Sequence, residues 1–445
     1  MNKNFEKQLW ELANVIRGNA DATEYRNIIL TLVLIKGISD THNSAWWNKI
    51  KNCNTNVKET LKCTINDIEA KYPQIKDTLS WIFNKSSINT ETLQKTINTF
   101  SALEESQEDT FGRVYEYCLK KFAKQEGQNS GQFYTPVCIV KLLVEILNPH
   151  DGILYDPCMG SGGMFVQSTT KRGNNLKVYG QELNPTTWRL SKVNMFLKGI
   201  NCDMGSGPAD TLLNDIHTAL KADYIMANPP FNLSRWGAEK VLNDKRWVYG
   251  QPTDKNANFS WIQHMLYHLK DNGRIGLVLT NGSLSAKKNG EGKIRENLIK
   301  DGLVECIISL PSNLFYTTQI PVCLWVLSKK RKNTTLFIDA TDRGKKNVNG
   351  DTELTDKAIK DIANNYHSYI RNEKIDDNCA IANINKIKEQ GYILSPARYV
   401  DIPSIKSERI NEKAINNEIK ENTAILMELF NKSRYLEDKI LEDFS

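Results

Sequence analysis

Apolar positions follow different periods along the chain, and the first region has the period of helices. Phe5, Leu9, Leu12 and Ile16 follow one another at helical spacing, and an apolar run covers residues 28–35. Residues 40–100 are polar with scattered aromatic residues, which suits short helices and loops. Because apolar residues three and four positions apart share one face of a helix, the pattern predicts an all-helical N-terminal domain over residues 1–125.

From about residue 130 short apolar runs alternate with segments of helical period. The runs predict strands at 153–155, 177–183, 223–227, 274–280, 304–310, 323–328 and 336–340, with helices at 137–147, 186–197, 259–269 and 292–300. Nearly continuous apolar strands that alternate with helices are typical of a parallel sheet covered on both faces. We therefore expect an α/β domain with a doubly wound, mostly parallel sheet over residues 126–340. Such sheets bind ligands beyond the carboxyl ends of their strands.

The C-terminal region divides into a polar extension at residues 341–403 and a different tail at 404–445. In the tail, six of eight positions at alternating three- and four-residue spacing are apolar, namely Ile415, Ile419, Leu426, Leu429, Leu436 and Ile440. This seam predicts a coiled-coil-like helix that pairs with a partner, with packing on its own chain as the alternative. Residues 401–445 have 7 basic and 10 acidic side chains, so the tail is not expected to bind DNA.

Composition narrows the class of protein without naming an activity. The 445 residues are 40% hydrophobic and 25% charged with a net charge of +6, which fits a globular protein and permits polyanion binding. Nine cysteines stand singly without a C-x-x-C pair, which predicts no disulfide framework and a cytoplasmic location. The start lacks a signal peptide. The most apolar run, residues 28–35, is less than half as long as a membrane-spanning helix, so no membrane association is expected.

The strongest local motif is Asn228-Pro229-Pro230-Phe231, directly after the predicted strand at 223–227. Two prolines cannot continue a ladder, so the asparagine is held in a stiff turn at the strand's carboxyl end. Its side-chain oxygen and a proline carbonyl can accept both hydrogens of an exocyclic amine, which fits amine methylation. Phe231 offers a face on which a flipped base stacks. A plain proline-rich turn is the alternative.

A glycine-rich loop after the first strand is the second motif. It reads Asp156-Pro-Cys-Met-Gly160-Ser161-Gly162-Gly163, and an acid beside glycines suits a cationic ligand such as S-adenosylmethionine better than a pyrophosphate. Glu182 follows the next strand, where an acid bonds ribose hydroxyls in nucleotide-binding folds. Asp210 is a candidate acceptor for the cofactor's adenine amine. Upstream, the aromatic loop Gln132-Phe133-Tyr134-Thr135-Pro136 is expected to close over the methionine end. The alternatives are a plain turn for the glycine cluster, a solvated side chain for Glu182, and core positions for Phe133 and Tyr134.

The series GQFYTP, DPCMGSGG, GQEL, ADTL and NPPF, in this order, resembles the modification (methyltransferase) subunits of type I restriction–modification systems. The likeness extends to the helical start and to GYILSPARYV near residue 400, and is vaguest at 40–100 and 341–390. It implies a Rossmann-like class I methyltransferase sheet and adenine-N6 methylation of DNA. It also implies that residues 132–136, Asp156, Gly160 to Gly163, Glu182 and Asp210 hold the cofactor, and that Asn228 to Phe231 hold the target adenine.

The resemblance also implies partners. These are double-stranded DNA, a DNA specificity subunit docked on the helix at 404–445, an ATP-dependent restriction subunit, and two copies of this chain per specificity subunit. The chain has no G-x-x-x-x-G-K-[ST] motif, so it is not expected to be the restriction subunit itself. The connection 232–258, with Trp236 and Trp247, is a candidate DNA-facing segment unless these tryptophans are packing residues.

Three alternatives remain at this point. His264 and His268 have the spacing of a zinc-binding pair, but no Glu or Cys completes a site, so no metal is expected. Methylation of an rRNA base or of a protein glutamine uses a similar loop, more often with Tyr after the prolines. A non-catalytic assembly subunit is the third, and the intact Asn228 and glycine loop argue against it.

Overall fold

A computed structural model describes residues 22–42, 44–53, 55–84, 89–101, 135–172, 175–315, 319–347, 350, 352–400 and 412–443. They fall into two compact units, one within residues 1–400 and the other within 401–445. The expected residues Gln132, Phe133 and Tyr134 lie outside the described part, as do all residues between 102 and 125.

The described residues of the N-terminal part, from 22 to 101, form helices, whereas Phe5, Leu9, Leu12 and Ile16 of the predicted period lie outside the described part. The helices are α2 (Ala22–Thr41), α3 (Trp46–Lys51), α4 (Val57–Lys71), η1 (Pro73–Ile75), α5 (Leu79–Asn84) and α6 (Thr90–Ser101). The run at 28–35 lies in α2 and is buried throughout, because the other helices of this part pack around it. The same core takes in Leu190 and Val193 of the later helix α10 (Pro185–Leu197).

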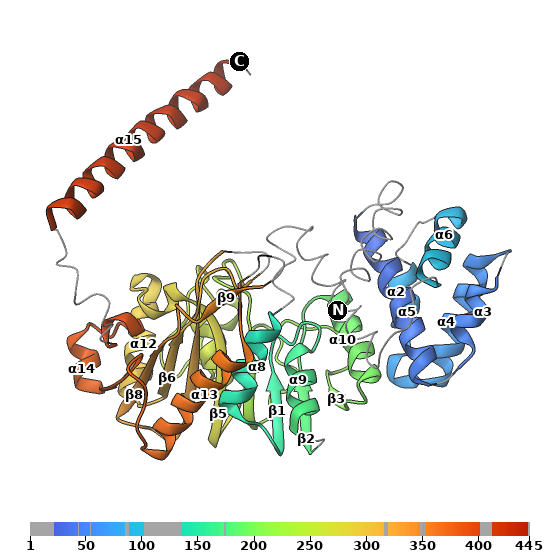
Figure 1. Cartoon of the computed structure of the whole chain (residues 1–445), viewed down its shortest axis with the longest axis horizontal. Helices are drawn as coiled ribbons and strands as arrows, with labels where there is room; N and C mark the ends of the chain where they lie inside the picture. The colour runs from blue at the N-terminus through green and yellow to red at the C-terminus, as the bar shows by residue number, and fades with distance from the viewer. Residues whose placement is uncertain are drawn as a thin grey trace. The chain divides into compact units, whose positions relative to one another are not determined.

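The centre of the first unit is a nine-stranded sheet in the order β11-β8-β6-β7-β5-β4-β1-β2-β3 (Figure 1). Its strands are β1 (Gly152–Asp156), β2 (Leu176–Gly180), β3 (Cys202–Asp203), β4 (Ala222–Ala227), β5 (Leu269–Thr280), β6 (Val304–Ser309), β7 (Val322–Ser328), β8 (Thr334–Asp339) and β11 (Cys379–Asn383). Seven strands run the same way, and β7 and β11 are antiparallel to their neighbours. The expected mostly parallel α/β sheet is therefore confirmed.

Helices pack against both faces of this sheet. They include α8 (Val137–Leu147), α9 (Gly163–Arg172), α11 (Asn258–His268), α12 (Glu291–Lys300) and α13 (Asp356–Arg371). Leu324 and Val326 of β7 share a core with α8, α9 and α13. Trp325 between them points the other way and meets Phe259 of α11 edge to face. This alternation explains why the strand reads as continuously apolar: both of its faces are covered.

Residues 341–400 belong to the same compact unit as the sheet. They contain the small ladder of β9 (Gly344–Lys346) and β10 (Thr352–Leu354), then α13, β11, α14 (Ile384–Glu389) and η6 (Pro396–Arg398). Their polar composition has a simple cause, because each element buries one face only: Ile359, Ile362 and Tyr366 of α13 enter the core. Three short helices, η3 (Ala238–Val241), η4 (Asn281–Leu284) and η5 (Lys288–Gly290), complete the unit. The expected domain boundaries at residues 125, 340 and 403 stay predictions.

The described residues of the second unit form the helix α15 (Glu412–Asp443). Every side chain described in it, from residue 421 to 437, is exposed, including Leu426, Leu429 and Leu436 of the predicted seam. No helix among the described residues is both long and apolar enough to cross a membrane.

Candidate active site

The two main motifs meet because three neighbouring strands end at one edge of the sheet. Strand β1 ends at Asp156 and pairs in parallel with β2 on one side and β4 on the other. Glu182 follows β2 by two residues, and Asn228 directly follows β4. The chain leaves β1 toward β2 and β3 and returns to the opposite side with β4. This reversal opens a crevice in doubly wound sheets, so the topology itself brings the acids and the asparagine together.

The strand predicted at 177–183 ends earlier than expected, at Gly180, and the difference shapes the site. The backbone N–H of Gln181 donates to the Asp156 carbonyl, and the Gln181 carbonyl accepts from the Met159 N–H (3.1 and 3.0 Å). Gln181 therefore pairs with the glycine-rich loop instead of extending the ladder. The following residue, Glu182, is turned toward that loop and accepts a hydrogen bond from the Gly160 N–H at 3.1 Å.

The glycine-rich loop needs its glycines at two positions. Gly160 and Gly162 have φ values of 54° and 81°, where side chains other than glycine are strained. A Cβ atom on Gly162 would also lie 2.5 Å from the Met195 Cε atom. The Asp156 Oδ1 atom accepts from the Cys158 N–H at 2.9 Å and fixes the start of the loop. The backbone consequently comes close to whatever lies above the strand ends.

The two acids of the site are buried and electrostatically unusual. Asp156 is 2% exposed, and burial, with a smaller contribution from the Glu182 charge, raises the pKa of Asp156 to about 7. Burial also raises the pKa of Glu182, while hydrogen bonds from the Asn184 and Gly160 N–H groups act in the opposite direction. A cation or a hydroxyl donor would stabilise both ionised carboxylates. The pair therefore favours a ligand that brings positive charge or hydroxyl groups.

In the Asn228 side-chain amide, the nitrogen is hydrogen-bonded and the oxygen has no partner among the described residues. The Nδ2 atom donates to the Thr135 hydroxyl at 3.0 Å. The Oδ1 atom is buried and has no hydrogen-bond partner among the described residues. A buried acceptor without a partner is costly, so an orphaned oxygen at a strand end indicates a position for a donor group of a ligand. The contact also connects two motifs that the sequence analysis kept apart, since Thr135 was expected beside the cofactor only.

A cavity of about 790 Å³ joins these groups. The predicted site residues that line it are Thr135, Asp156, Gly160, Ser161, Gly163, Glu182, Asp210, Asn228 and Pro230. Pro136, Gly162, Pro229 and Phe231 do not line it. The Phe231 ring packs edge to face on Phe315 with centroids 5.4 Å apart. The cavity has the size of a small-molecule site, and Asn228 and the acidic pair both line it.

A further part of the cavity lining was not predicted. It includes Leu233, Arg235, Trp236, Gly237 and Lys240, from the connection after the Asn228–Phe231 motif. Asp254 shapes this part of the lining: its Oδ1 atom accepts from the Gly237 and Ala238 N–H groups at 2.7 and 3.1 Å, and its carbonyl accepts from the Arg235 N–H at 2.7 Å. The connection has no periodic pattern, so no local signal in the sequence identifies these residues.

Trp236 and Trp247 are packing residues rather than exposed DNA-facing ones. They are 6% and 8% exposed, and their rings meet edge to face with centroids 6.2 Å apart. Each indole N–H donates to a backbone carbonyl, of Thr253 and Val241 respectively. The connection is thus folded on itself next to the cavity.

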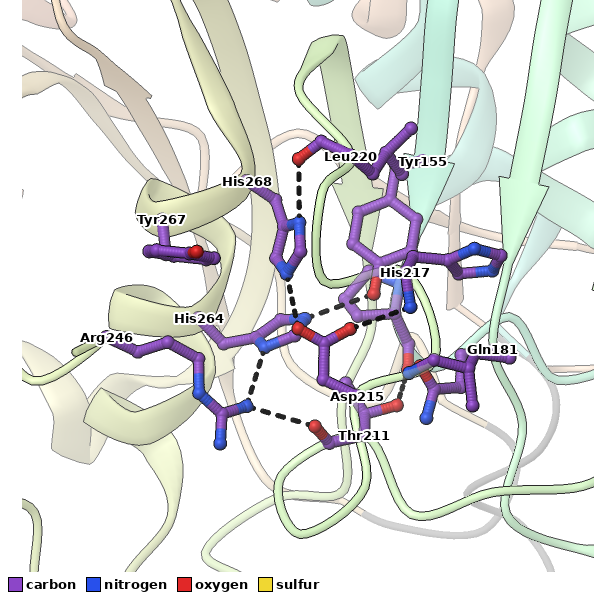
Figure 2. A network of polar contacts seen from close by, with 12 residues as sticks. Tyr155, Gln181, Thr211, Asp215, His217, Leu220, Arg246, His264, Tyr267 and His268 are labelled. Carbon is purple, nitrogen blue, oxygen red and sulfur yellow. Dashed lines mark hydrogen bonds and ion pairs between the residues drawn. The ribbon is translucent and has the colours of Figure 1, made fainter. Parts of the chain in front are cut away.

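The histidine pair on α11 does gain a third potential metal ligand, which the sequence analysis missed. Asp215, His264 and His268 each bring a ligand atom within 4.8 Å of the others (Figure 2). The His264 Nδ1 atom, however, faces the Arg246 guanidinium at 3.0 Å. Because a guanidinium only donates, that nitrogen accepts, and His264 Nε2 carries the proton toward the Tyr155 hydroxyl at 3.1 Å. A metal at His264 would meet a fixed positive charge nearby, so the cluster is better described as a hydrogen-bond network.

Comparisons with known proteins agree with this geometry. The family model described as N-6 DNA Methylase matches residues 106–408, and the one described as HsdM N-terminal domain matches residues 5–134. The chain belongs to the N-6 DNA methylase family. Within it, the chain is a methyltransferase subunit of the type I restriction–modification kind. The first model covers the sheet and every site residue that lines the cavity.

Two relatives and one solved structure illustrate the match to this family. The chain is 44% identical to the type I restriction enzyme HindI methylase subunit of Haemophilus influenzae, over 75% of this chain and 77% of that one. It is 31% identical to the MjaIX methylase subunit of Methanocaldococcus jannaschii, over 98% and 90%. A type I methyltransferase subunit from Streptococcus thermophilus superposes with a TM-score of 0.73 at 26% identity, over 90% and 99%. The Rossmann-like class I methyltransferase fold is thereby confirmed.

Proposed function

We propose that this chain transfers a methyl group from S-adenosylmethionine to the N6 atom of adenine in double-stranded DNA. The observation that carries the proposal is the Asn228 Oδ1 atom, which is buried and has no hydrogen-bond partner among the described residues, on a residue that lines the cavity. An exocyclic amine supplies the donor that this acceptor lacks. Because Thr135 holds the other end of the amide, the acceptor stays aimed at one position.

The residues of the cavity fit S-adenosylmethionine as the cofactor. When bound, it supplies an electrophilic methyl group on a sulfonium. Asp156 and Glu182 are buried acids whose pKa values burial raises, as expected of a site that takes positive charge or hydroxyl groups. We assign cofactor binding to Gln132, Phe133, Tyr134, Thr135, Pro136, Asp156, Gly160, Ser161, Gly162, Gly163, Glu182 and Asp210. The two acids beside the glycines support this assignment, and no metal is part of it.

Catalysis by this chain then consists of holding and orienting the target amine. The Asn228 Oδ1 atom and a carbonyl of Pro229 or Pro230 accept the two amine hydrogens, which directs the nitrogen lone pair toward the cofactor. The prolines keep both acceptors in a stiff turn. Phe231 supplies a ring against which the flipped adenine packs. Since the sulfonium would depart as a neutral thioether, which is a good leaving group, positioning would carry the transfer without a strong general base, and the proton that the methylated nitrogen loses would pass to solvent.

Assembly with other subunits is a second part of the proposal. A DNA specificity subunit docks on the helix at residues 404–445, two copies of this chain bind each specificity subunit, and an ATP-dependent restriction subunit joins the full complex. The exposed apolar residues of α15 support the docking site. The relatives named above, both methylase subunits of type I restriction enzymes, support this setting.

The test compares wild type with Asn228→Ala, using labelled S-adenosylmethionine and DNA with and without a specificity subunit. We expect the variant to bind the cofactor within about twofold of wild type and to lose methyl transfer by a factor of about 100 or more, the scale of removing one positioned hydrogen-bonding group. Asn333→Ala is the matched control, because Asn333 is exposed and does not line the cavity.

Three results would overturn the assignment. Equal transfer by wild type and Asn228→Ala would remove Asn228 from catalysis. Transfer to rRNA or to a protein glutamine, with none to DNA, would favour the alternative substrates. Cofactor binding without transfer to any of these acceptors, even with the specificity subunit present, would indicate an assembly subunit.

A further inference from the structure

Arg246 is a buried arginine that the proposed chemistry does not use. It lies in the connection between the catalytic motif and α11 and is 5% exposed. A buried guanidinium is tolerated only when its donors are paired. Arg246 pairs all five: Nε and Nη2 form a fork on the Asp244 carboxylate (2.9 and 2.8 Å), and the remaining three donors reach backbone or ring acceptors on other segments.

Two of those three acceptors belong to the wall of the cavity. Nη1 donates to the Thr211 carbonyl at 3.1 Å, and Nη2 donates to the Leu212 carbonyl at 2.6 Å. Thr211 and Leu212 line the cavity beside Asp210, whereas Arg246 does not. The arginine therefore holds this stretch of wall from behind, as Figure 2 shows for its bond to Thr211.

The stretch of Thr211 and Leu212 is also hydrogen-bonded to the glycine-rich loop and to the Asp210 carboxylate. The Thr211 hydroxyl donates to the Pro157 carbonyl of the glycine-rich loop. The Asp210 Oδ1 atom accepts from the Leu212 and Leu213 N–H groups at 3.0 and 3.2 Å. Arg246 binds the carbonyl groups of Thr211 and Leu212, and Asp210 binds the N–H groups of Leu212 and Leu213. The backbone of this stretch is therefore held through both its donors and its acceptors.

The fifth donor anchors Arg246 to the scaffold. Nη1 also donates to His264 Nδ1 on α11, and His264 reaches Tyr155 in β1. One helical turn further, His268 contacts the Leu220 carbonyl through Nδ1 and the Asp215 carboxylate through Nε2, at 2.9 Å each (Figure 2). Asp215 lies in the same connection as Thr211, so α11 fixes that connection at two points.

The residue next to Arg246 reaches another part of the cavity lining. Trp247 packs on Trp236, which lines the cavity from the connection after the catalytic motif. Arg246 and Trp247 together thus join the wall at 210–213 to the wall at 233–240.

We propose that Arg246 is a positioning residue for cofactor binding, which keeps the wall at Asp210–Leu213 in the geometry that the cofactor requires and ties it to the wall after the catalytic motif. This rests on the proposed function, in which the cavity takes S-adenosylmethionine. Arg246 touches neither the cofactor space nor the target amine position, so its loss should reduce cofactor affinity more than the rate of the transfer step.

The experiment measures S-adenosylmethionine affinity of the full-length chain by calorimetry, together with a thermal unfolding curve. We expect Arg246→Gln to weaken binding at least tenfold. In the complex with a specificity subunit and DNA, the variant should raise KM for the cofactor at least tenfold and keep kcat within about threefold of wild type.

Arg295→Gln is the matched control. Arg295 is 1% exposed and also donates to backbone carbonyls, those of Ser283, Ala286 and Tyr392, none of which lines the cavity. We expect it to lower the unfolding temperature and to leave cofactor affinity within twofold of wild type. If it weakens binding as much as Arg246→Gln, general destabilisation explains the effect and the proposal fails.

Asp244→Asn keeps the experiment decisive if Arg246→Gln does not fold. It leaves the arginine in place but removes one acceptor of the fork, and we expect about a threefold loss of affinity. Wild-type affinity in either folded variant overturns the proposal. A wild-type chain that does not bind S-adenosylmethionine would instead overturn the proposed function, so the two failures are distinguishable.

Discussion

Asp156 and Glu182 place two buried carboxyl groups beside one glycine-rich loop. Because burial raises the pKa of Asp156 to about 7, its charge changes within the range in which binding is measured. The ionised form is the one that attracts a cationic ligand. Affinity for S-adenosylmethionine should therefore rise as the pH rises through about 7.

This pH dependence is testable by calorimetry at pH 6 and pH 7.5, below the pKa of about 7.7–8.0 of an ordinary α-amino group. If the bound cofactor keeps Asp156 ionised, the affinity should follow the ionised fraction and be roughly eightfold higher at pH 7.5. Asp156→Asn should bind more weakly and lose most of the pH dependence, with Glu182 responsible for any remainder. An equal wild-type affinity at both pH values would contradict the assignment of Asp156 to the cofactor site.

The sequence alone located the residues whose position depends on a strand end. Asp156 and Asn228 each follow an apolar run directly, and parallel neighbouring strands end at the same edge of a sheet. Arg246 and Asp215 could not be found in this way. Their roles depend on contacts with α11 residues 18 and 53 positions away, and neither residue stands in a periodic pattern or a motif.

At the scale of elements, strands and helices of the sheet domain follow the predicted order, since continuous apolar runs identify strands that are covered on both faces. An apolar run does not indicate in which direction its strand runs within the sheet. Strand β7 is as apolar as β6 and yet runs antiparallel to it. Nor did β11 stand out, because it is an edge strand with mixed burial. Pairing across the sheet, and not local pattern, decides both.

Helix α15 allows the docking proposal to be tested with two single substitutions. Leu429 belongs to the predicted seam and is 57% exposed, whereas Met427 lies outside the seam and is 64% exposed. We expect Leu429→Glu to weaken binding of a specificity subunit at least tenfold, because a coiled-coil seam buries its leucines and a buried carboxylate is unfavourable. Met427→Glu should change binding by less than threefold.

A pull-down titration with purified specificity subunit provides the measurement. Equal weakening by both substitutions would show that the docking face is not the predicted seam. If neither substitution changes binding, α15 is not the docking element. Since both side chains are exposed in this chain, neither change should alter its unfolding temperature appreciably.

At the scale of the whole molecule, the modest net charge of +6 hides an uneven division. Residues 1–400 contain 51 basic and 42 acidic side chains, a net charge of +9, and residues 401–445 contain 7 and 10, a net charge of −3. Phosphate contacts provide most of the affinity for DNA irrespective of sequence. The charge available for such contacts therefore lies in the unit that contains the candidate active site, and the acidic tail has none to add.

Deleting residues 412–445 should separate DNA binding from assembly. We expect the truncated chain to bind non-specific duplex DNA as tightly as the full chain, or slightly more tightly because an acidic segment is gone. For both proteins, affinity should fall by about 10- to 100-fold between 50 and 200 mM salt, as for two to four phosphate contacts. The truncated chain should also bind S-adenosylmethionine normally and fail to bind a specificity subunit. Loss of DNA binding on truncation, with cofactor binding intact, would place the DNA contacts in the tail and contradict the division of charge.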